Sequence, residues 1–339
     1  MISSIDRARP SSVRTAIHEI SSRGERKQVP ALYLDDTLIV TRGKIVRVAE
    51  VFDEYWLEAS SLPDPLWMIQ GLVDLPDRPD LLTFSQRVAD PLPRFRFHME
   101  WGNIAVLPVS SYETWLQRQI SAASRRNVRA SERKGVIVRE ARFDEEYVRG
   151  IKAIYDENPI RHGRRYWHYG KSFERVRTEN GTYAERSTFL GAYWRDELVG
   201  YMKIVWDVDQ GGIMQIVSKM QHFDKRPNNA LLAHAVRLCS SRGVRRLLYE
   251  KFVYGGNQDS SLTRFKRENG FVRVDVPRYY VPLTGRGRVW LRLGLHRDPR
   301  QRIPWWLKQR LVSMRSRLHG KSGSGIRQGS GIGQGATLE

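Results

Sequence analysis

The chain has 339 residues, and 57 lysines and arginines against 37 aspartates and glutamates give it a formal net charge of +20. Hydrophobic residues make up 40% of the sequence, which excludes a disordered chain and supplies enough apolar surface for one large core or two ordinary ones. A single cysteine, Cys239, excludes a disulfide framework and a cysteine-rich zinc site, and no apolar run is long enough to span a membrane.

In chain order, residues 1–30 lack a clear apolar period, and we expect a flexible segment with a weak helix over residues 13–20. Residues 37–52 contain two β-branched runs around Gly43 and Lys44, which predicts a β-hairpin. A proline-rich stretch and alternating aromatic residues follow. The region 31–111 therefore predicts a small mixed unit.

From residue 112 onward, helices and strands alternate irregularly. Residues 112–135 predict one long helix that ends at Gly135, and residues 187–206 predict a hairpin of two apolar strands. The other predicted elements are a strand at 136–140, helices at 144–158, 228–243 and 260–270, and strands at 212–221, 245–253, 271–276 and 278–283. This order predicts a mixed α/β fold and excludes a doubly wound Rossmann sheet, which would alternate regularly.

The strand at 212–221 leads through a basic loop into the helix at 228–243. A helix N-terminus offers unpaired N–H groups and the positive end of its dipole, which favours a pyrophosphate there. Lys225 and Arg226 add charge-assisted contacts. The alternative is a plain helix capped by Asn228 or Asn229 behind a solvated basic loop.

These segments together resemble the GNAT superfamily of acyl-CoA N-acyltransferases, and more closely its Fem-type relatives with tandem GNAT-like units. FLGAYWRDELVGYMKIVW looks like the paired central strands, and GIMQIVSKM looks like the strand that meets the pantetheine arm. KRPNNA is similar to the family's Arg/Gln-x-x-Gly-x-Gly/Ala loop, with Asn in place of the central Gly. SRRNVRASERKGVIVRE and LTRFKRENGFVRV look like two further Fem-type segments.

The resemblance implies a GNAT-like mixed central sheet flanked by helices, with a degenerate N-terminal unit at 31–111 and an acyltransferase unit at 112–284. It implies acyl-CoA, with acetyl-CoA first, as the donor, and an amine of a small molecule, an amino sugar or a cell-surface precursor as the acceptor. The expected cofactor-binding residues are Gln215, Ile216, Val217, Lys225, Arg226, Asn228, Asn229, Ala230 and Asn257.

Transfer of an acyl group to an amine needs a neutral amine, a polarised carbonyl and an acid for the leaving group. Candidates near strand ends or in the closing helix are Asp207, Tyr249, Glu250 and Lys266. In ordinary GNAT enzymes a tyrosine of the closing helix can be the acid, but the register here places Phe265 and Lys266. The proton donor therefore stays unassigned, and an ordinary surface or ion-paired role is the alternative for each candidate.

The segment NPIRHGRRYWHYGKSFE interleaves cations with aromatic rings, a combination that can bind phosphate or carboxylate and stack a ring. It predicts an acceptor-binding lid or, alternatively, a structural loop with solvated cations. The expected substrate-binding residues are Arg161, Arg164, His168, Tyr169, Lys171 and, from the hairpin, Tyr201. We expect no metal site, because the sequence has no His-Glu-x-x-His motif and no cysteine pair.

The positive charge gathers in two places. Eleven basic residues and one acidic residue lie between Arg286 and Lys321. A second cluster comprises Arg118, Arg125, Arg126, Arg129, Arg133, Lys134 and Arg139. Such local patches favour an anionic partner that touches specific places on the protein.

The first patch lies in a region, 285–320, that predicts a basic amphipathic C-terminal helix, followed by a disordered tail at 321–339. The helix can fold back on the body, contact an anionic membrane through residues 286–320, or contact nucleic acid. We expect a cytoplasmic protein, with peripheral contact at the inner membrane face as an option.

Two other functions stay open. A Fem-type transferase would use aminoacyl-tRNA as its donor, with the Arg125–Lys134 cluster and the basic tail holding RNA. A non-catalytic adaptor would use the same fold to bind nucleic acid or an anionic membrane.

Overall fold

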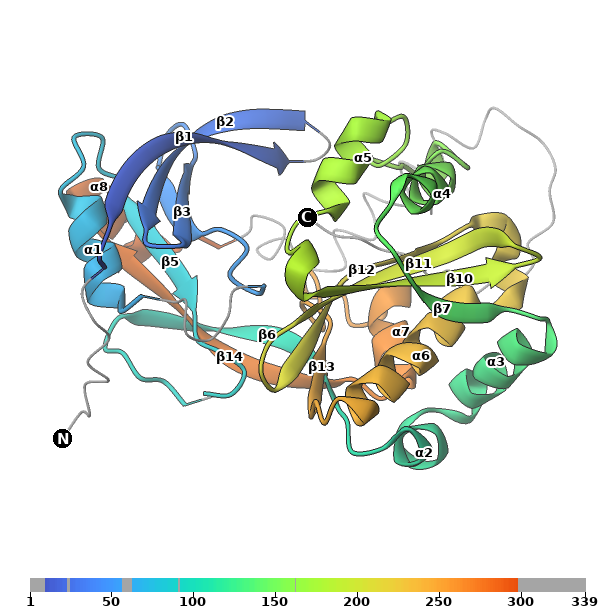
Figure 1. Ribbon diagram of the computed structural model, residues 1–339. Coiled ribbons are helices and arrows are strands. Elements are labelled where there is room, and N and C mark those ends of the chain that lie inside the picture. The colour runs from blue at the N-terminus through green and yellow to red at the C-terminus, as the bar shows by residue number, and fades with distance from the viewer. Residues whose placement is uncertain (1–9, 23–24, 57–62, 91, 162, 298–339) are drawn as a thin grey trace, which may run out of the picture.

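A large mixed β-sheet runs through the described part of the chain (Figure 1). The computed structural model describes residues 10–22, 25–56, 63–90, 92–161 and 163–297. Twelve described strands form the sheet in the order β1-β2-β3-β4-β5-β14-β6-β13-β12-β11-β10-β7. Their bounds are β1 Val13–Ser22, β2 Glu25–Leu34, β3 Thr37–Arg42, β4 Val48–Val51, β5 Leu81–Ser85, β6 His98–Pro108, β7 Ile137–Ala141, β10 Ser187–Trp194, β11 Glu197–Trp206, β12 Gln210–Ser218, β13 Arg246–Leu248 and β14 Val272–Pro282. The short strands β8 Ile160–Arg161 and β9 Arg164–Arg165 pair separately.

Helices cover both faces of the β10–β12 region, with α4 and α5 on one face and α3, α6 and α7 on the other (Figure 1). Beside β1–β5 lie α1 and α8. The helix bounds are α1 Pro65–Val73, α2 Tyr112–Thr114, α3 Ala122–Arg133, α4 Glu145–Tyr155, α5 Phe173–Asn180, α6 Pro227–Ser241, α7 Ser261–Glu268 and α8 Gly285–Arg292. Each helical layer closes its own apolar core against the sheet.

The hairpin of β10 and β11 and the helix α6 are confirmed, and both follow from local chemistry. Arg195 and Asp196 adopt positive φ angles of 50° and 66°, the conformation of the tight turns that suit twisted antiparallel strands. On α6, apolar residues at helical spacing, among them Leu232, Val236 and Cys239, are fully buried against the sheet. The free thiol of Cys239 thus belongs to the core.

Two predicted helices are wrong. Residues 13–22 form the strand β1, paired along its whole length with β2, so this hairpin occupies much of the segment that we expected to be flexible. The long helix over 112–135 is interrupted: after α2 comes a π-helical turn, Trp115–Gln119, and Ile120 is extended at φ −93° and ψ 155°. The next helix, α3, starts afresh because the Ser121 side chain accepts from the backbone N–H of Ser124.

The predicted boundary at residue 111 falls just after β6, which pairs with β13 on one side and with β14 on the other. The sheet is thus continuous across that boundary, and the division into units stays a prediction. Of the predicted C-terminal extension, α8 is described, whereas the predicted amphipathic helix and tail beyond residue 297 lie outside the described residues. None of the described helices combines the length and apolar character needed to cross a membrane.

A buried carboxylate anchors α8 to the sheet. Asp80 is 1% exposed and accepts from the backbone N–H of Arg47 at 2.9 Å and from the Thr284 hydroxyl at 2.6 Å. Its carbonyl accepts from the N–H of Leu283, at 2.9 Å. These bonds fix the start of α8, and Gly287 lies so close that an added Cβ would stand 2.0 Å from the Asp80 carbonyl oxygen.

We predict that Gly287→Ala lowers the free energy of unfolding by about 1–3 kcal/mol, because the helix must move away from Asp80 to make room. Urea unfolding measures the loss. The matched control is Gly285→Ala on the same helix, where the nearest atom to an added Cβ is the end of Arg288 at 4.0 Å. Equal stability of the two variants would contradict the described packing of α8.

Candidate active site

The candidate site lies where β12 and β13 separate. β12 pairs with β11 along its length, but its parallel pairing with β13 covers only Gln210↔Arg246 to Gly212↔Leu248. No described strand pairs with residues 213–218 of β12 on that side. Unpaired backbone N–H and C=O groups of this edge are available to a ligand. The predicted cofactor-binding residues Gln215, Ile216 and Val217 lie on it. We call this opening the β12–β13 splay.

Beyond β13 the chain stays hydrogen-bonded to β6 and so leaves β12. The N–H of Tyr249 donates to the Ala105 carbonyl at 2.9 Å, and the N–H of Ala105 donates to the Glu250 carbonyl at 2.7 Å. Glu250 adopts a φ of 41°. Such left-handed backbone at a residue other than glycine is strained and is concentrated at functional sites.

Glu250 is surrounded by groups that perturb its protonation. Burial raises the pKa of the Glu250 carboxyl, although a 2.6 Å hydrogen bond from the Tyr254 hydroxyl and the charge of Lys266 oppose the shift. Lys266 is fully buried, and its ammonium donates to the carbonyls of Tyr249 at 2.8 Å and Lys251 at 2.6 Å. Burial lowers the pKa of Lys266, with Glu250 opposing.

The structure therefore brings together three of the four predicted catalytic residues, Tyr249, Glu250 and Lys266. Lys266 holds the two carbonyls that flank Glu250, so it positions the carboxylate. Asp207 is separate from them, because it lies in the turn between β11 and β12 and accepts from its neighbour's N–H, that of Val208, at 2.8 Å. Asn257 is exposed in the loop after Tyr254, and its side chain accepts from the N–H of Asp259.

A polar network behind β12 fixes the side chain of Gln215. The Tyr155 hydroxyl donates to Gln215 Oε1 at 2.8 Å, and the Tyr201 hydroxyl contacts the same oxygen. Tyr201 also donates to Asn180 Oδ1, at 3.1 Å. With its oxygen occupied, Gln215 keeps its NH₂ group, which has no partner among the described residues, as a donor for a ligand. Tyr201, predicted to bind substrate, is 0% exposed and instead positions Gln215.

The predicted acceptor-binding lid is largely internal. Arg161 is buried and donates to the carbonyls of Ser218 at 3.0 Å and Ile154 at 2.8 Å. The ring of His168, also buried, packs 4.1 Å from that of Tyr155, and its Nδ1 contacts buried Lys171 at 3.3 Å. Burial lowers the pKa of His168 well below its usual range, with the charge of Lys171 adding to the shift.

The alternative of a structural loop with solvated cations is therefore wrong for these three residues, because all three are buried, and Arg161 supports the end of β12. Tyr169 is 47% exposed and stays accessible. The backbone of Arg164 lies in β9, and its side chain lies outside the described part.

The start of α6 matches a pyrophosphate site only in part. Pro227 has no N–H group, and the N–H groups of Asn229 and Ala230 already donate to the Arg226 carbonyl at 3.1 and 3.2 Å. In this first turn only the N–H of Asn228 lacks a described backbone acceptor. Lys225 is paired with Asp224 at 3.3 Å and lies over the Trp194 ring.

One wall of the splay comes from the loop after β4, which sequence reasoning did not identify. Trp56 covers Gly212, where an added Cβ would stand 2.5 Å from the indole ring. Tyr55 packs near Leu248 and interacts electrostatically with Glu250. The only signal was a run of acidic and aromatic residues, DEYW, and nothing in it indicated contacts some 150 to 200 residues away.

The same loop is held by polar and charged side chains around Asp53. Asp53 accepts from the Tyr183 hydroxyl at 3.0 Å, and Lys203 of β11, 0% exposed, donates to Thr182 Oγ1 at 3.0 Å. Burial lowers the pKa of Lys203 to about 8, with the charge of Asp53 opposing. Burial likewise raises the pKa of Asp53.

No family model matches the sequence, and no curated protein matches it. Solved structures do resemble the fold. FemX is 9% identical at a TM-score of 0.51, over 79% of this chain and 88% of that one. The C-terminal DUF2156 domain of a putative lysylphosphatidylglycerol synthetase from Agrobacterium fabrum is 12% identical at a TM-score of 0.50, over 76% of this chain and 84% of that one. At these identities the similarity shows a shared fold, and it confirms the mixed, GNAT-like sheet that the sequence predicts.

We predict that the wild type gains stability relative to Lys203→Met as the pH rises from 7 to 10, by about 2 kcal/mol. The folded-state pKa of Lys203 lies below its unfolded value, so the unfolded state binds more protons in this window and folding carries a penalty that fades as the pH rises. Denaturant unfolding at several pH values measures the difference. Parallel stability curves would contradict a depressed pKa, and Lys44→Met, at an exposed lysine, is the control.

Proposed function

We propose that the protein is an acyltransferase that moves an acyl group from an activated ester or thioester to an amine in the β12–β13 splay. The observation that carries the proposal is the end of β12–β13 pairing at Gly212↔Leu248, beside a strained, half-buried Glu250 whose carboxyl pKa is raised. The residue pattern that resembles Fem-type chains supports it, and so does the fold shared with FemX.

In the proposed reaction the neutral amine attacks the acyl carbonyl carbon, a C–N bond forms, and the bond to the carrier's sulfur or oxygen breaks. Those backbone N–H groups of residues 213–218 that face away from β11, together with the NH₂ group of Gln215, stabilise the negative charge that develops on the carbonyl oxygen. Glu250 accepts the proton that the amine loses. The Tyr254 hydroxyl, held at Glu250, is the candidate donor to the leaving group.

The raised pKa of Glu250 suits this exchange, because a carboxyl that titrates nearer neutrality both accepts and returns a proton readily. Lys266 supports it indirectly by holding the turn 249–251. The proton acceptor, the proton donor and the N–H groups that the proposed reaction requires are thus all present in this chain.

For the donor, acyl-CoA with acetyl-CoA first is what the resemblance implies. The start of α6 would bind its pyrophosphate through the Asn228 N–H, with Lys225 and Arg226 nearby. The acceptor is the amine of a small molecule, an amino sugar or a cell-surface precursor.

A specific observation favours aminoacyl-tRNA as a second candidate donor. The first turn of α6 offers fewer amide donors than a pyrophosphate loop needs, whereas α3 exposes Arg126, Arg129 and Arg133 to solvent. A surface of this kind binds a nucleic-acid backbone through its charge. If the protein transfers an acyl group from neither donor, the remaining function is a non-catalytic adaptor that binds nucleic acid or an anionic membrane.

We predict that Glu250→Gln lowers the rate of acyl transfer at least 100-fold, because the amide cannot accept the amine's proton. The assay follows thiol release from acetyl-CoA and, separately, deacylation of aminoacyl-tRNA in the presence of a set of amines. Glu146→Gln, an exposed acid in the first turn of α4, is the control and should keep the wild-type rate. A fully active Glu250→Gln enzyme would remove Glu250 from the mechanism.

We predict that replacing Arg126, Arg129 and Arg133 together by Gln weakens tRNA binding at least tenfold and makes it less salt-dependent. Filter binding at several salt concentrations measures both effects. A matched triple variant at exposed residues of the N-terminal half, Arg26, Lys27 and Lys44, should bind tRNA like the wild type. Equal losses in the two triple variants would indicate attraction by net charge alone and would contradict a tRNA site on α3.

A further inference from the structure

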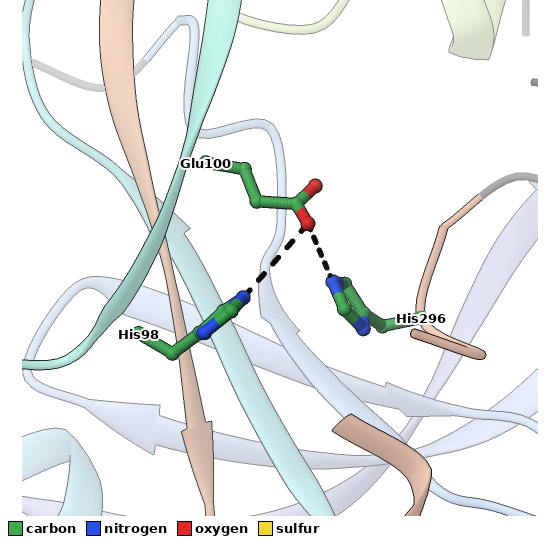
Figure 2. Close-up of side chains that lie close together, drawn as sticks. All are labelled: His98, Glu100 and His296. Carbon is green, nitrogen blue, oxygen red and sulfur yellow. Dashed lines mark hydrogen bonds and ion pairs between the residues drawn. The ribbon is translucent and has the colours of Figure 1, made fainter. Parts of the chain in front are cut away.

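Three potential metal ligands converge far from the β12–β13 splay, at the junction of β6 with the turn that follows α8. His98 and Glu100 are two residues apart on β6, so the alternation of the strand places their side chains on one face. His296 arrives from the turn after α8. Figure 2 shows the two imidazole rings on either side of the Glu100 carboxylate.

The ligand atoms lie close enough to share one ion. His296 Nε2 is 2.8 Å from Glu100 Oε1, His98 Nε2 is 3.8 Å from the same oxygen, and all three atoms lie within 4.8 Å of one another. Neighbouring ligand atoms of a tetrahedral zinc ion stand roughly 3–3.5 Å apart, given metal–ligand distances of about 2.0–2.1 Å. Small rotations of the side chains would therefore complete a three-ligand set.

The surroundings hold this arrangement and leave it accessible. The His296 side chain is only 2% exposed, and its ring packs against Tyr280 with centroids 4.6 Å apart. Beside the cluster lies an open hollow of about 380 Å³, lined by His98, residues 291–294, His296 and Arg297. One ligand is thus fixed by packing, while the hollow gives an ion and a water molecule a route to the site.

Two features of the cluster oppose tight binding of a metal ion. The Arg297 guanidinium donates to Glu100 Oε1 at 2.7 Å and competes with a cation for that oxygen. His296 Nδ1 is buried and has no acceptor among the described residues, whereas metal-bound histidines usually donate their second N–H to a neighbour. Missing support of this kind typically costs 10–100-fold in metal affinity. The affinity expected is therefore micromolar, well short of that of a closed structural zinc site.

We propose that His98, Glu100 and His296 form a binding site for a single zinc ion, with water in the fourth position. Two imidazoles and one carboxylate are a donor set that zinc takes in proteins, and three protein ligands leave one coordination position open. The ion would tie the turn after α8 to β6, and it would bind independently of the acyl-transfer site. Sequence reasoning predicted no metal because ligands separated by 196 residues form no local motif.

The test is a zinc titration of untagged, full-length protein in competition with a chromophoric chelator at pH 7.5. We expect one zinc equivalent with a micromolar Kd and a rise in melting temperature when zinc is added. His98→Ala should weaken binding at least tenfold, and it should fold normally because the His98 side chain is 42% exposed. The control is His18→Ala on β1, which should bind zinc like the wild type.

Arg297→Gln distinguishes a zinc site from an ion pair that only holds the turn against β6. If the cluster binds zinc, removal of the competing cation should tighten zinc binding several-fold. If it is only an ion pair, the variant should lose stability and gain no affinity for zinc. Cobalt gives a second readout, because a tetrahedral site yields visible absorption bands that His98→Ala should abolish. Failure of the wild type to bind zinc above its His98→Ala variant would overturn the proposal.

Discussion

The candidate active site depends on the brevity of one strand pairing. β13 shares a parallel ladder with β12 over only Gln210↔Arg246 to Gly212↔Leu248, and then the chain follows β6. The reason is that the chain after β13 forms its backbone hydrogen bonds with β6 and not with β12. The N–H of Tyr249 donates to the Ala105 carbonyl, and the Glu250 carbonyl accepts from the Ala105 N–H. In this arrangement Glu250 adopts left-handed backbone. The resulting splay leaves an edge of β12 unpaired beside a perturbed carboxyl.

Buried polar groups then hold the two arms of the splay in place. On the β12 arm, Tyr155 and Tyr201 occupy the oxygen of Gln215, while buried Arg161 supports the strand's last carbonyl. On the other arm, Lys266 holds the carbonyls that flank Glu250. Each of these groups loses its solvation on burial and is therefore compensated by specific partners, which makes the site rigid and also sensitive to single substitutions.

The elements that the sequence predicted correctly are those with strong local signals. Apolar periodicity predicted α6 and the hairpin of β10 and β11, and the position of Glu250 toward the end of the strand predicted over 245–253 indicated it as a candidate, although the observed strand β13 is shorter and ends at Leu248. The failures have non-local causes. The strand β1 carries exposed apolar residues such as Ile17, and its conformation is set by pairing with β2 and not by its own pattern. Trp56, Tyr254 and Lys203 gain their roles only through contacts made in the folded chain.

The most direct test of the proposed site is hydrogen–deuterium exchange of the protein alone, with acetyl-CoA and, separately, with aminoacyl-tRNA. An acyl donor in the splay must cover the unpaired N–H groups of β12 and the turn that carries Glu250. The expected result is slower exchange in peptides that span residues 213–218 and 249–254 with at least one donor, and unchanged exchange in the hairpin of β1 and β2. Unchanged exchange in both site peptides with both donors, or protection confined to other regions, would contradict the assignment.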